Sequence, residues 1–268
     1  MEIAIKGLIA LGSVGFLFSV LLAFLSKKFH VREDPLIEKL NEALPGIHCG
    51  ACGYSGCHAY AEALAAGKAD PTMCRAGGAE SQKRIAALLK VEVKKLSPQK
   101  IVVHCGADTT QKKSSTLYVG PESCAAAHLL GAKIDCKYGC LFFGDCVKIC
   151  PVGALKISQG KVYVDHKRCI RCGKCVGACP RNLIELVTVS PIQPLYYVAC
   201  SNREKALYVR GVCSRGCIAC GICARIENSP FYIENNISRI KREGDIDIPA
   251  ASSAKDKCPT HCIDSDDV

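Results

Sequence analysis

The sequence has no tryptophan, only two methionines and 6% aromatic residues among its 268 positions. It has no G-x-G-x-x-G run after a predicted strand, no P-loop and no flavin-attachment signal. The formal net charge is +10, but no basic stripe is interleaved with aromatic side chains, which argues against a nucleic-acid partner. Cysteine, in contrast, is abundant, with 21 copies.

The cysteines fall in runs that are typical of iron–sulfur ligation. The run CIRCGKCVGACP places Cys169, Cys172, Cys175 and Cys179 at the C-x2-C-x2-C-x3-C-P spacing of bacterial ferredoxins, in which the fourth thiolate ligates the other cluster. Secreted disulfide scaffolds are usually small and lack such runs, and zinc sites seldom place three cysteines two residues apart. We therefore expect clusters that assemble on free thiols in a reducing compartment.

The N-terminal residues predict a membrane anchor. Residues 3–25 are nearly all apolar, with one lysine near the start. This segment is long enough to cross a bilayer as a helix. Lys27, Lys28 and Arg32 follow, so the positive-inside rule places the bulk of the chain in the cytoplasm. A cleaved signal peptide and a buried core helix are the alternatives, but no A-x-A site precedes the lysines. We expect a single-pass protein of the inner (cytoplasmic) membrane, anchored by residues 1–28.

Residues 30–90 predict a small iron–sulfur domain. Its four cysteines follow a C-x2-C-x4-C-x16-C spacing, at Cys49, Cys52, Cys57 and Cys74. The loop also contains Gly50, Gly53 and Gly56. We expect these glycines to adopt positive φ values and to turn backbone N–H groups toward a cluster. Short helices are predicted over 58–66 and 82–89. The set could hold a [4Fe-4S] or a [2Fe-2S] cluster, with zinc as the alternative.

Residues 91–135 form a predicted linking segment. Residues 101–120 alternate enough to predict a hairpin around a polar turn, and SCAAAHLLGAK predicts a short helix that ends near Gly131. Cys105 and Cys124 lie in this segment without cluster spacing. They are either free buried cysteines or supplementary ligands.

Residues 136–190 contain an internal repeat. CVKICPVGALKI (146–157) and CVGACPRNLIEL (175–186) each supply C-x3-C-P and then a strand-like run. In the first half, Phe143 stands where the middle cysteine of the loop is expected, and Cys136 precedes Cys140 by four residues. We infer that Cys136 replaces the missing ligand. The crossover of the ferredoxin motif then predicts one cluster at Cys136, Cys140, Cys146 and Cys179, and a second at Cys150, Cys169, Cys172 and Cys175.

Residues 195–268 repeat the pattern in degenerate form. Glu227 occupies the slot of the fourth cysteine in the first run, and Ile248, Ala251 and Ala254 stand where a second loop would carry its cysteines. One coherent ligand set remains, at Cys217, Cys220, Cys223 and Cys258. Cys213 is a competing fourth ligand, and the roles of Cys200 and Cys262 stay open.

This order of features resembles the B-type subunit of the Rnf electron transport complex over essentially the whole chain. The shared features are a single N-terminal anchor, the run LPGIHCGACGYSGC with Cys74, and a two-cluster ferredoxin module. The resemblance implies an electron-transfer subunit of a membrane-bound, ion-translocating ferredoxin:NAD oxidoreductase. Soluble ferredoxin would exchange electrons with it, and other membrane subunits would carry the nicotinamide chemistry and the ion path.

The expected fold class is α+β. It comprises a transmembrane helix, a four-cysteine domain, a two-cluster ferredoxin-like domain and a degenerate one-cluster ferredoxin-like domain, with four clusters in all. A ferredoxin-like subunit of a hydrogenase or quinone reductase is the alternative function, and a non-redox scaffold for structural metals is a third.

Overall fold

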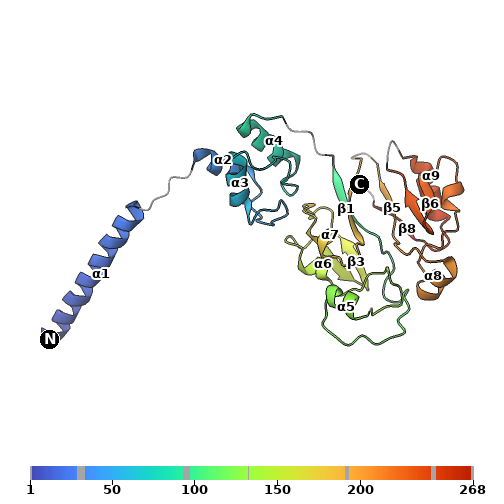
Figure 1. Ribbon diagram of the computed structural model, residues 1–268, viewed down its shortest axis with the longest axis horizontal. Coiled ribbons are helices and arrows are strands. Elements are labelled where there is room, and N and C mark those ends of the chain that lie inside the picture. Colours follow the sequence, from blue (N-terminus) through green and yellow to red (C-terminus); the bar gives the residue numbers. More distant parts are fainter. Residues whose placement is uncertain are drawn as a thin grey trace.

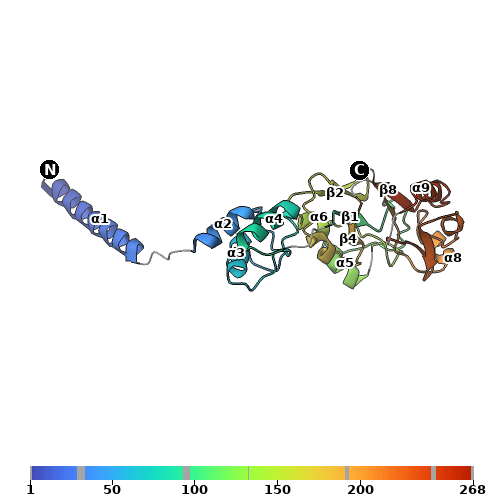
Figure 2. The same cartoon turned by 90° about the horizontal axis from the view of Figure 1, so that it is seen from above.

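The computed structural model describes residues 2–28, 34–92, 97–131, 133–190, 193–242 and 246–266. Arg32, one of the basic residues behind the predicted orientation of the anchor, lies outside the described residues. Figures 1 and 2 both show the folded units in chain order: a helical unit near the N-terminal helix, then a module built on β1 to β4, then a module built on β5 to β8.

The N-terminal helix α1 spans Glu2–Lys28 and ends in two lysines. Within the described part of the chain it is the one helix that is long and apolar enough to cross a membrane, and none of its Leu11–Lys28 stretch is buried. A 27-residue helix exceeds the length that a bilayer core requires. The predicted anchor therefore has the length and the exposed apolar surface that it needs.

The small cysteine domain (residues 34–92) packs three helices, α2 Pro35–Ala43, α3 Cys57–Ala65 and α4 Gly78–Leu89. Helices α3 and α4 confirm the helices predicted over 58–66 and 82–89. Helix α2 was not predicted, although Asp34 marks its start: the Asp34 carboxylate accepts a hydrogen bond from the Leu36 N–H at 2.8 Å. The core of the domain consists of Leu40, Tyr60, Leu64 and Ile85, all at most 2% exposed.

The central module (residues 99–190) contains four strands and three short helices. Its elements are β1 Gln99–Val103, α5 Cys124–Leu130, α6 Asp145–Lys148, β2 Leu155–Ser158, β3 Lys161–Val164, α7 Lys174–Ala178 and β4 Ile184–Thr188. The outer strands β1 and β4 form one antiparallel ladder, and the inner strands β2 and β3 form another. This is the βαββαβ order expected for a ferredoxin-like repeat, with one additional helix, α5, between β1 and α6.

The hairpin predicted over residues 101–120 is wrong. Strand β1 pairs with β4, Ile101 facing Leu186, and the following residues form no strand, apart from an isolated bridge between Lys112 and Cys213. Residues 101–103 are all apolar and buried: Ile101 and Val103 pack in one cluster and Val102 packs in another. Helix α5, followed by Gly131, confirms the short helix predicted in the same segment.

The C-terminal module (residues 195–266) repeats the strand pairing. Its elements are β5 Leu195–Val198, α8 Ala206–Val212, the 3-10 helix η1 Cys223–Arg225, β6 Phe231–Glu234, β7 Ile237–Ile240, α9 Ile248–Asp256 and β8 Ile263–Asp266. Strand β5 pairs with β8, and β6 pairs with β7. Ala251 and Ala254 of α9 are fully buried in the core, so a packed helix stands where the second loop of a complete ferredoxin would carry cysteines.

Candidate iron–sulfur centres

Three cysteine loops share one backbone conformation. They begin at Cys140, Cys169 and Cys217. The second residue after each of these cysteines has positive φ: Phe142 (62°), Arg171 (57°) and Ala219 (51°). So does the glycine two residues before the last cysteine of each loop: Gly144 (78°), Gly173 (80°) and Gly221 (75°). Alternating positive and negative φ values turn successive N–H groups to one side and create a concavity for a negatively charged group.

The first of these loops borders a small cavity. The cysteines that line it are Cys124, Cys140, Cys146 and Cys179, and most of the other lining side chains are apolar. Burial raises the pKa of the Cys146 thiol to about 11, and the neighbouring thiols of Cys124 and Cys179 contribute to the increase. The cavity therefore disfavours thiolates until a cation neutralises them, as the irons of a cluster do.

Cys124 reaches this cavity because α5 docks onto the start of α6. The Asp145 carboxylate accepts hydrogen bonds from Ser123 Oγ at 2.9 Å and from the Ala125 N–H at 3.1 Å. Ser123 is the N-cap of α5, and Asp145 directly precedes Cys146. The Asp145 carboxylate thus holds the first turn of α5 beside the loop. This contact brings Cys124 close to the loop, whose middle position has no cysteine.

The structure places Cys136 away from the loop of Cys140 and Cys146. Cys136 does not line the cavity of Cys140, Cys146 and Cys179; it lines a second cavity, together with cysteines of the C-terminal module. Sequence proximity suggested Cys136 as the replacement ligand, whereas the docked helix α5 supplies Cys124 from farther away. These positions favour Cys124 over Cys136 as the fourth thiol beside this cavity.

The second set of the central module gathers around the loop that begins at Cys169. Burial raises the pKa of the Cys175 thiol to about 12, and the thiols of Cys169, Cys172, Cys146 and Cys150 contribute to the increase. The Ala154 N–H donates a hydrogen bond to Cys150 Sγ at 3.2 Å. Cys150 thus lies with the second loop although it belongs to the first run, as the crossover of the ferredoxin motif requires.

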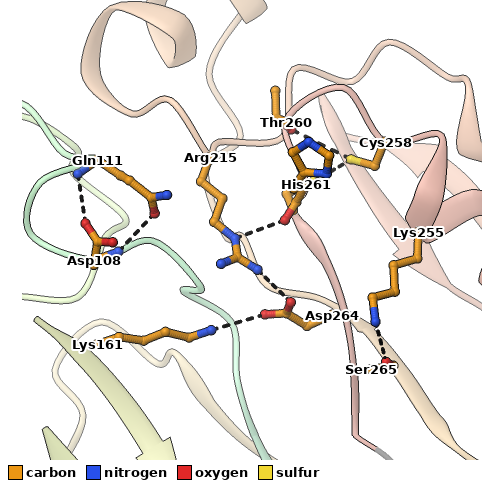
Figure 3. Close-up of polar contacts among 11 residues, drawn as sticks. Asp108, Gln111, Lys161, Arg215, Lys255, Cys258, Thr260, His261, Asp264 and Ser265 are labelled. Carbon is orange, nitrogen blue, oxygen red and sulfur yellow. Dashed lines mark hydrogen bonds and ion pairs between the residues drawn. The ribbon is translucent and has the colours of Figure 1, made fainter. Parts of the chain in front are cut away.

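The C-terminal module also has a small cavity that is lined by cysteines. Its cysteines are Cys217, Cys220, Cys223, Cys258 and Cys262. Cys258 Sγ lies 3.8 Å from Thr260 Oγ1 (Figure 3). It lies 3.6 Å from Cys262 Sγ. A hydrogen bond from the Cys262 thiol lowers the pKa of Cys258 to about 5. Cys213, the competing fourth ligand in the sequence, does not line this cavity.

The small cysteine domain also brings its four cysteines together. Burial raises the pKa of Cys74, and the thiols of Cys52, Cys57 and Cys49 raise it further, while a hydrogen bond from the Gly77 N–H lowers it. The four sulfurs therefore lie close enough to interact electrostatically.

Two of the three loop glycines of this domain adopt the expected conformation. Gly50 and Gly53 have φ values of 68° and 88°, but Gly56 is extended, so its predicted positive φ is wrong. Gly56 is required for another reason: a Cβ atom there would lie 2.9 Å from Nδ1 of His48. That nitrogen accepts a hydrogen bond from the Cys57 N–H at 3.2 Å, so His48 orients the backbone of a cysteine.

The donor sets fit iron–sulfur clusters better than single metal ions. In the described residues, no three histidine, cysteine, aspartate or glutamate side chains converge closely enough to hold one metal ion. The thiols instead surround cavities, and soft thiolate ligands around a larger space are what a cluster requires.

Comparison with known proteins agrees with this chemistry. Residues 44–76 match a family described as "Putative Fe-S cluster", and residues 162–185 match a family described as "4Fe-4S binding domain". The chain is 36% identical over 267 residues to the B-type subunit of the "Proton-translocating ferredoxin:NAD(+) oxidoreductase complex" of Clostridium ljungdahlii, covering 98% of this chain and 93% of that protein. The chain belongs to this family of B-type subunits.

Other members of the family are similar over comparable lengths. The B-type subunit of the "Na(+)-translocating ferredoxin:NAD(+) oxidoreductase complex" of Acetobacterium woodii is 35% identical over 259 residues, which cover 96% of this chain and 76% of that protein. The B-type subunit of the "Ion-translocating oxidoreductase complex" of Methanosarcina acetivorans is 35% identical over 225 residues, which cover 84% of each chain. These relatives confirm the resemblance seen in the sequence.

Proposed function

We propose that this chain is the membrane-anchored electron-transfer subunit of an ion-translocating ferredoxin:NAD(+) oxidoreductase complex. The observation that carries the proposal is the repeated ferredoxin-like strand order with cysteines around its cavities, in a chain of this family. The relatives' printed names supply the reaction, and the cysteine sets supply a physical basis for electron transfer.

Four ligand sets support [4Fe-4S] clusters in this proposal. They are Cys49, Cys52, Cys57 and Cys74; Cys124, Cys140, Cys146 and Cys179; Cys150, Cys169, Cys172 and Cys175; and Cys217, Cys220, Cys223 and Cys258. A bound cluster stores and passes one electron at a time with little structural change. The first set could also hold a [2Fe-2S] cluster.

The protein's own groups tune such sites through hydrogen bonds and burial. The Leu183 N–H donates to Cys179 Sγ at 3.4 Å, the Ala154 N–H to Cys150 Sγ at 3.2 Å and the Ser238 N–H to Cys217 Sγ at 3.4 Å. Because N–H donors stabilise the added negative charge of the reduced state, these bonds raise the reduction potential.

The proposed location is the inner (cytoplasmic) membrane, with the cysteine-bearing units in the cytoplasm. Lys27 and Lys28 at the end of α1 favour this orientation. Soluble ferredoxin, which is cytoplasmic, is the proposed electron donor or acceptor. Other membrane subunits of the complex are the proposed partners for the ion path and the nicotinamide chemistry.

The test uses the full chain in lipid nanodiscs, loaded anaerobically with ferrous iron and sulfide. Chemically reduced ferredoxin is then added, and bleaching of the visible cluster absorbance is followed. We expect reduction of the loaded chain, and no change in a sample from which iron and sulfide were omitted. A fully loaded chain that ferredoxin does not reduce would contradict the proposed function.

A further inference from the structure

Four cysteines that the ligand sets above do not use line one cavity between the two modules. The cavity is enclosed by residues of both modules, as the cavity of the Cys217 set is enclosed by residues of the C-terminal module. Cys105 and Cys136 come from the central module, and Cys200 and Cys213 come from the C-terminal module. Cys105 and Cys136 are at most 8% exposed. Burial raises the pKa of the Cys200 thiol to about 12.

The four cysteines are equivalent in pairs. Cys105 follows the end of β1 by two residues, and Cys200 follows the end of β5 by two residues. Cys136 precedes Cys140 by four residues, as Cys213 precedes Cys217. Each module thus contributes one cysteine after its first strand and one cysteine before its loop. Such equivalent pairs are what a site shared by two copies of a repeated fold would have.

The hydrogen bonds follow the same symmetry. The Cys140 N–H donates to Cys105 Sγ at 3.3 Å, and the Cys217 N–H donates to Cys200 Sγ at 3.3 Å. In each module the first cysteine of a ferredoxin-type loop therefore directs its amide at a sulfur of the cavity. One hydrogen bond therefore joins the cavity to the ligand set of each module.

Backbone and ionic contacts hold the two modules together around this cavity. The Gly106 N–H donates to the Ala199 carbonyl at 2.8 Å, and the Lys113 N–H donates to the Val212 carbonyl at 2.9 Å. Figure 3 shows Asp264 of β8 between two cations: Arg215 Nη2 lies 2.6 Å from Oδ1, and Lys161 Nζ of the central module lies 3.6 Å from Oδ2. The junction is therefore a fixed part of the fold.

The lining of the cavity suits a negatively charged group. Asn202, only 2% exposed, directs Nδ2 at Cys136 Sγ at 3.5 Å. Lys112, only 6% exposed, and Arg215 also line the cavity, and Lys112 Nζ donates to the Cys140 carbonyl at 3.2 Å. A cubane with four thiolates carries net negative charge, which these donors and cations offset.

We propose that Cys105, Cys136, Cys200 and Cys213 hold an additional [4Fe-4S] cluster at the junction of the two modules. Five sets of four then account for every one of the 21 cysteines except Cys262. The site deepens the proposed function and rests on it: it supplies the link by which an electron passes between the Cys140 set and the Cys217 set.

The test counts iron and sulfide in the full chain after anaerobic loading with ferrous iron and sulfide. We expect about twenty iron atoms in the unmodified chain, and about four fewer in Cys136→Ala or in Cys200→Ala. The double variant Cys136→Ala/Cys200→Ala should lose about four, because both residues serve one cluster. Cys136→Ala/Cys140→Ala should lose about eight, because those residues serve two.

Several results would overturn the proposal. They are no loss of iron in Cys200→Ala, a loss of about eight in the Cys136→Ala/Cys200→Ala pair, or a loss of only about four in the Cys136→Ala/Cys140→Ala pair. Ser201→Ala, which changes a non-cysteine residue of the same cavity, is the matched control and should keep all iron.

A second variant does not depend on the folding of cysteine mutants. Asn202→Leu removes the N–H donor to Cys136 Sγ and should shift one reduction potential to a more negative value at unchanged iron content. If all potentials stay the same while iron is retained, the proposal fails. Failure of the proposed function would give a different result. The iron counts of the variants would be as expected, but ferredoxin would not reduce the loaded chain.

Discussion

At the residue scale, the position of a thiol in space matters more than its position in a motif. Cys124 lies outside any cluster spacing, yet it lines the cavity of Cys140 and Cys146, whereas Cys136, four residues from Cys140, faces the other module. Phe143 stands at the vacated middle position and packs on Tyr118, with ring centroids 5.3 Å apart. The loop keeps its conformation although one ligand comes from a distant helix.

Cys124→Ala should therefore remove the same cluster as Cys146→Ala. We expect each single variant to lose about four iron atoms and the double variant to lose no more than either. Iron and sulfide analysis of the loaded full chain measures this. His128→Ala, an exposed change on the same helix, is the control. Full iron content in Cys124→Ala would show that a different residue completes the set.

The choice between Cys258 and Cys262 gives a second prediction. Both thiols line the C-terminal cavity, but Cys258 carries the following proline that marks a cluster ligand in the ferredoxin run. Cys258→Ala should lose about four iron atoms and expose residues 246–266 to protease, while Cys262→Ala should keep its iron. The reverse pattern would make Cys262 the ligand.

Sequence reasoning succeeded where ligands are close together in the chain and failed where distant segments meet. The spacing of Cys169, Cys172 and Cys175 predicts a loop whose thiols the structure gathers with Cys150. No local pattern could predict the approach of Cys124, because it depends on the docking of α5 through Asp145. The ligand sets themselves remain predictions until iron is counted.

At the element scale, short segments depend on tertiary contacts for their position. Helix α5 has seven residues, which is too short to be stable alone, so its contacts with Asp145 and the core fix it. The predicted hairpin failed for a related reason. Strand β1 pairs with β4, about eighty residues later in the chain. A local pattern of apolar residues does not identify such a distant partner strand.

Asp145→Ala should loosen α5 without removing any cysteine. Loss of the carboxylate leaves Ser123 Oγ and the Ala125 N–H without their acceptor, a change worth about 1–3 kcal/mol. Hydrogen exchange should show lower protection of α5 amides, and a chelator should remove about four iron atoms faster than from the unmodified chain. Lys137→Ala, an exposed change nearby, should do neither. Unchanged protection of α5 would show that packing alone holds the helix.

At the scale of the whole molecule, the anchor and the cysteine-bearing units are separable. No residue of the Leu11–Lys28 stretch is buried against the rest of the protein. Deleting residues 1–28 should therefore give a soluble protein with unchanged iron content. Iron analysis and gel filtration of the loaded fragment measure this. A fragment that had lost iron would place α1 within the cluster-binding fold.

The pairing of the first and last strands gives each module entry and exit points at one edge. Gln99 faces Thr188 in the central module, and Leu195 faces Asp266 in the C-terminal module. A stretch of coding sequence with such ends can be duplicated in tandem or appended to a chain without threading through an existing sheet. A whole module can therefore be gained or lost without disturbing the strand pairing of its neighbours.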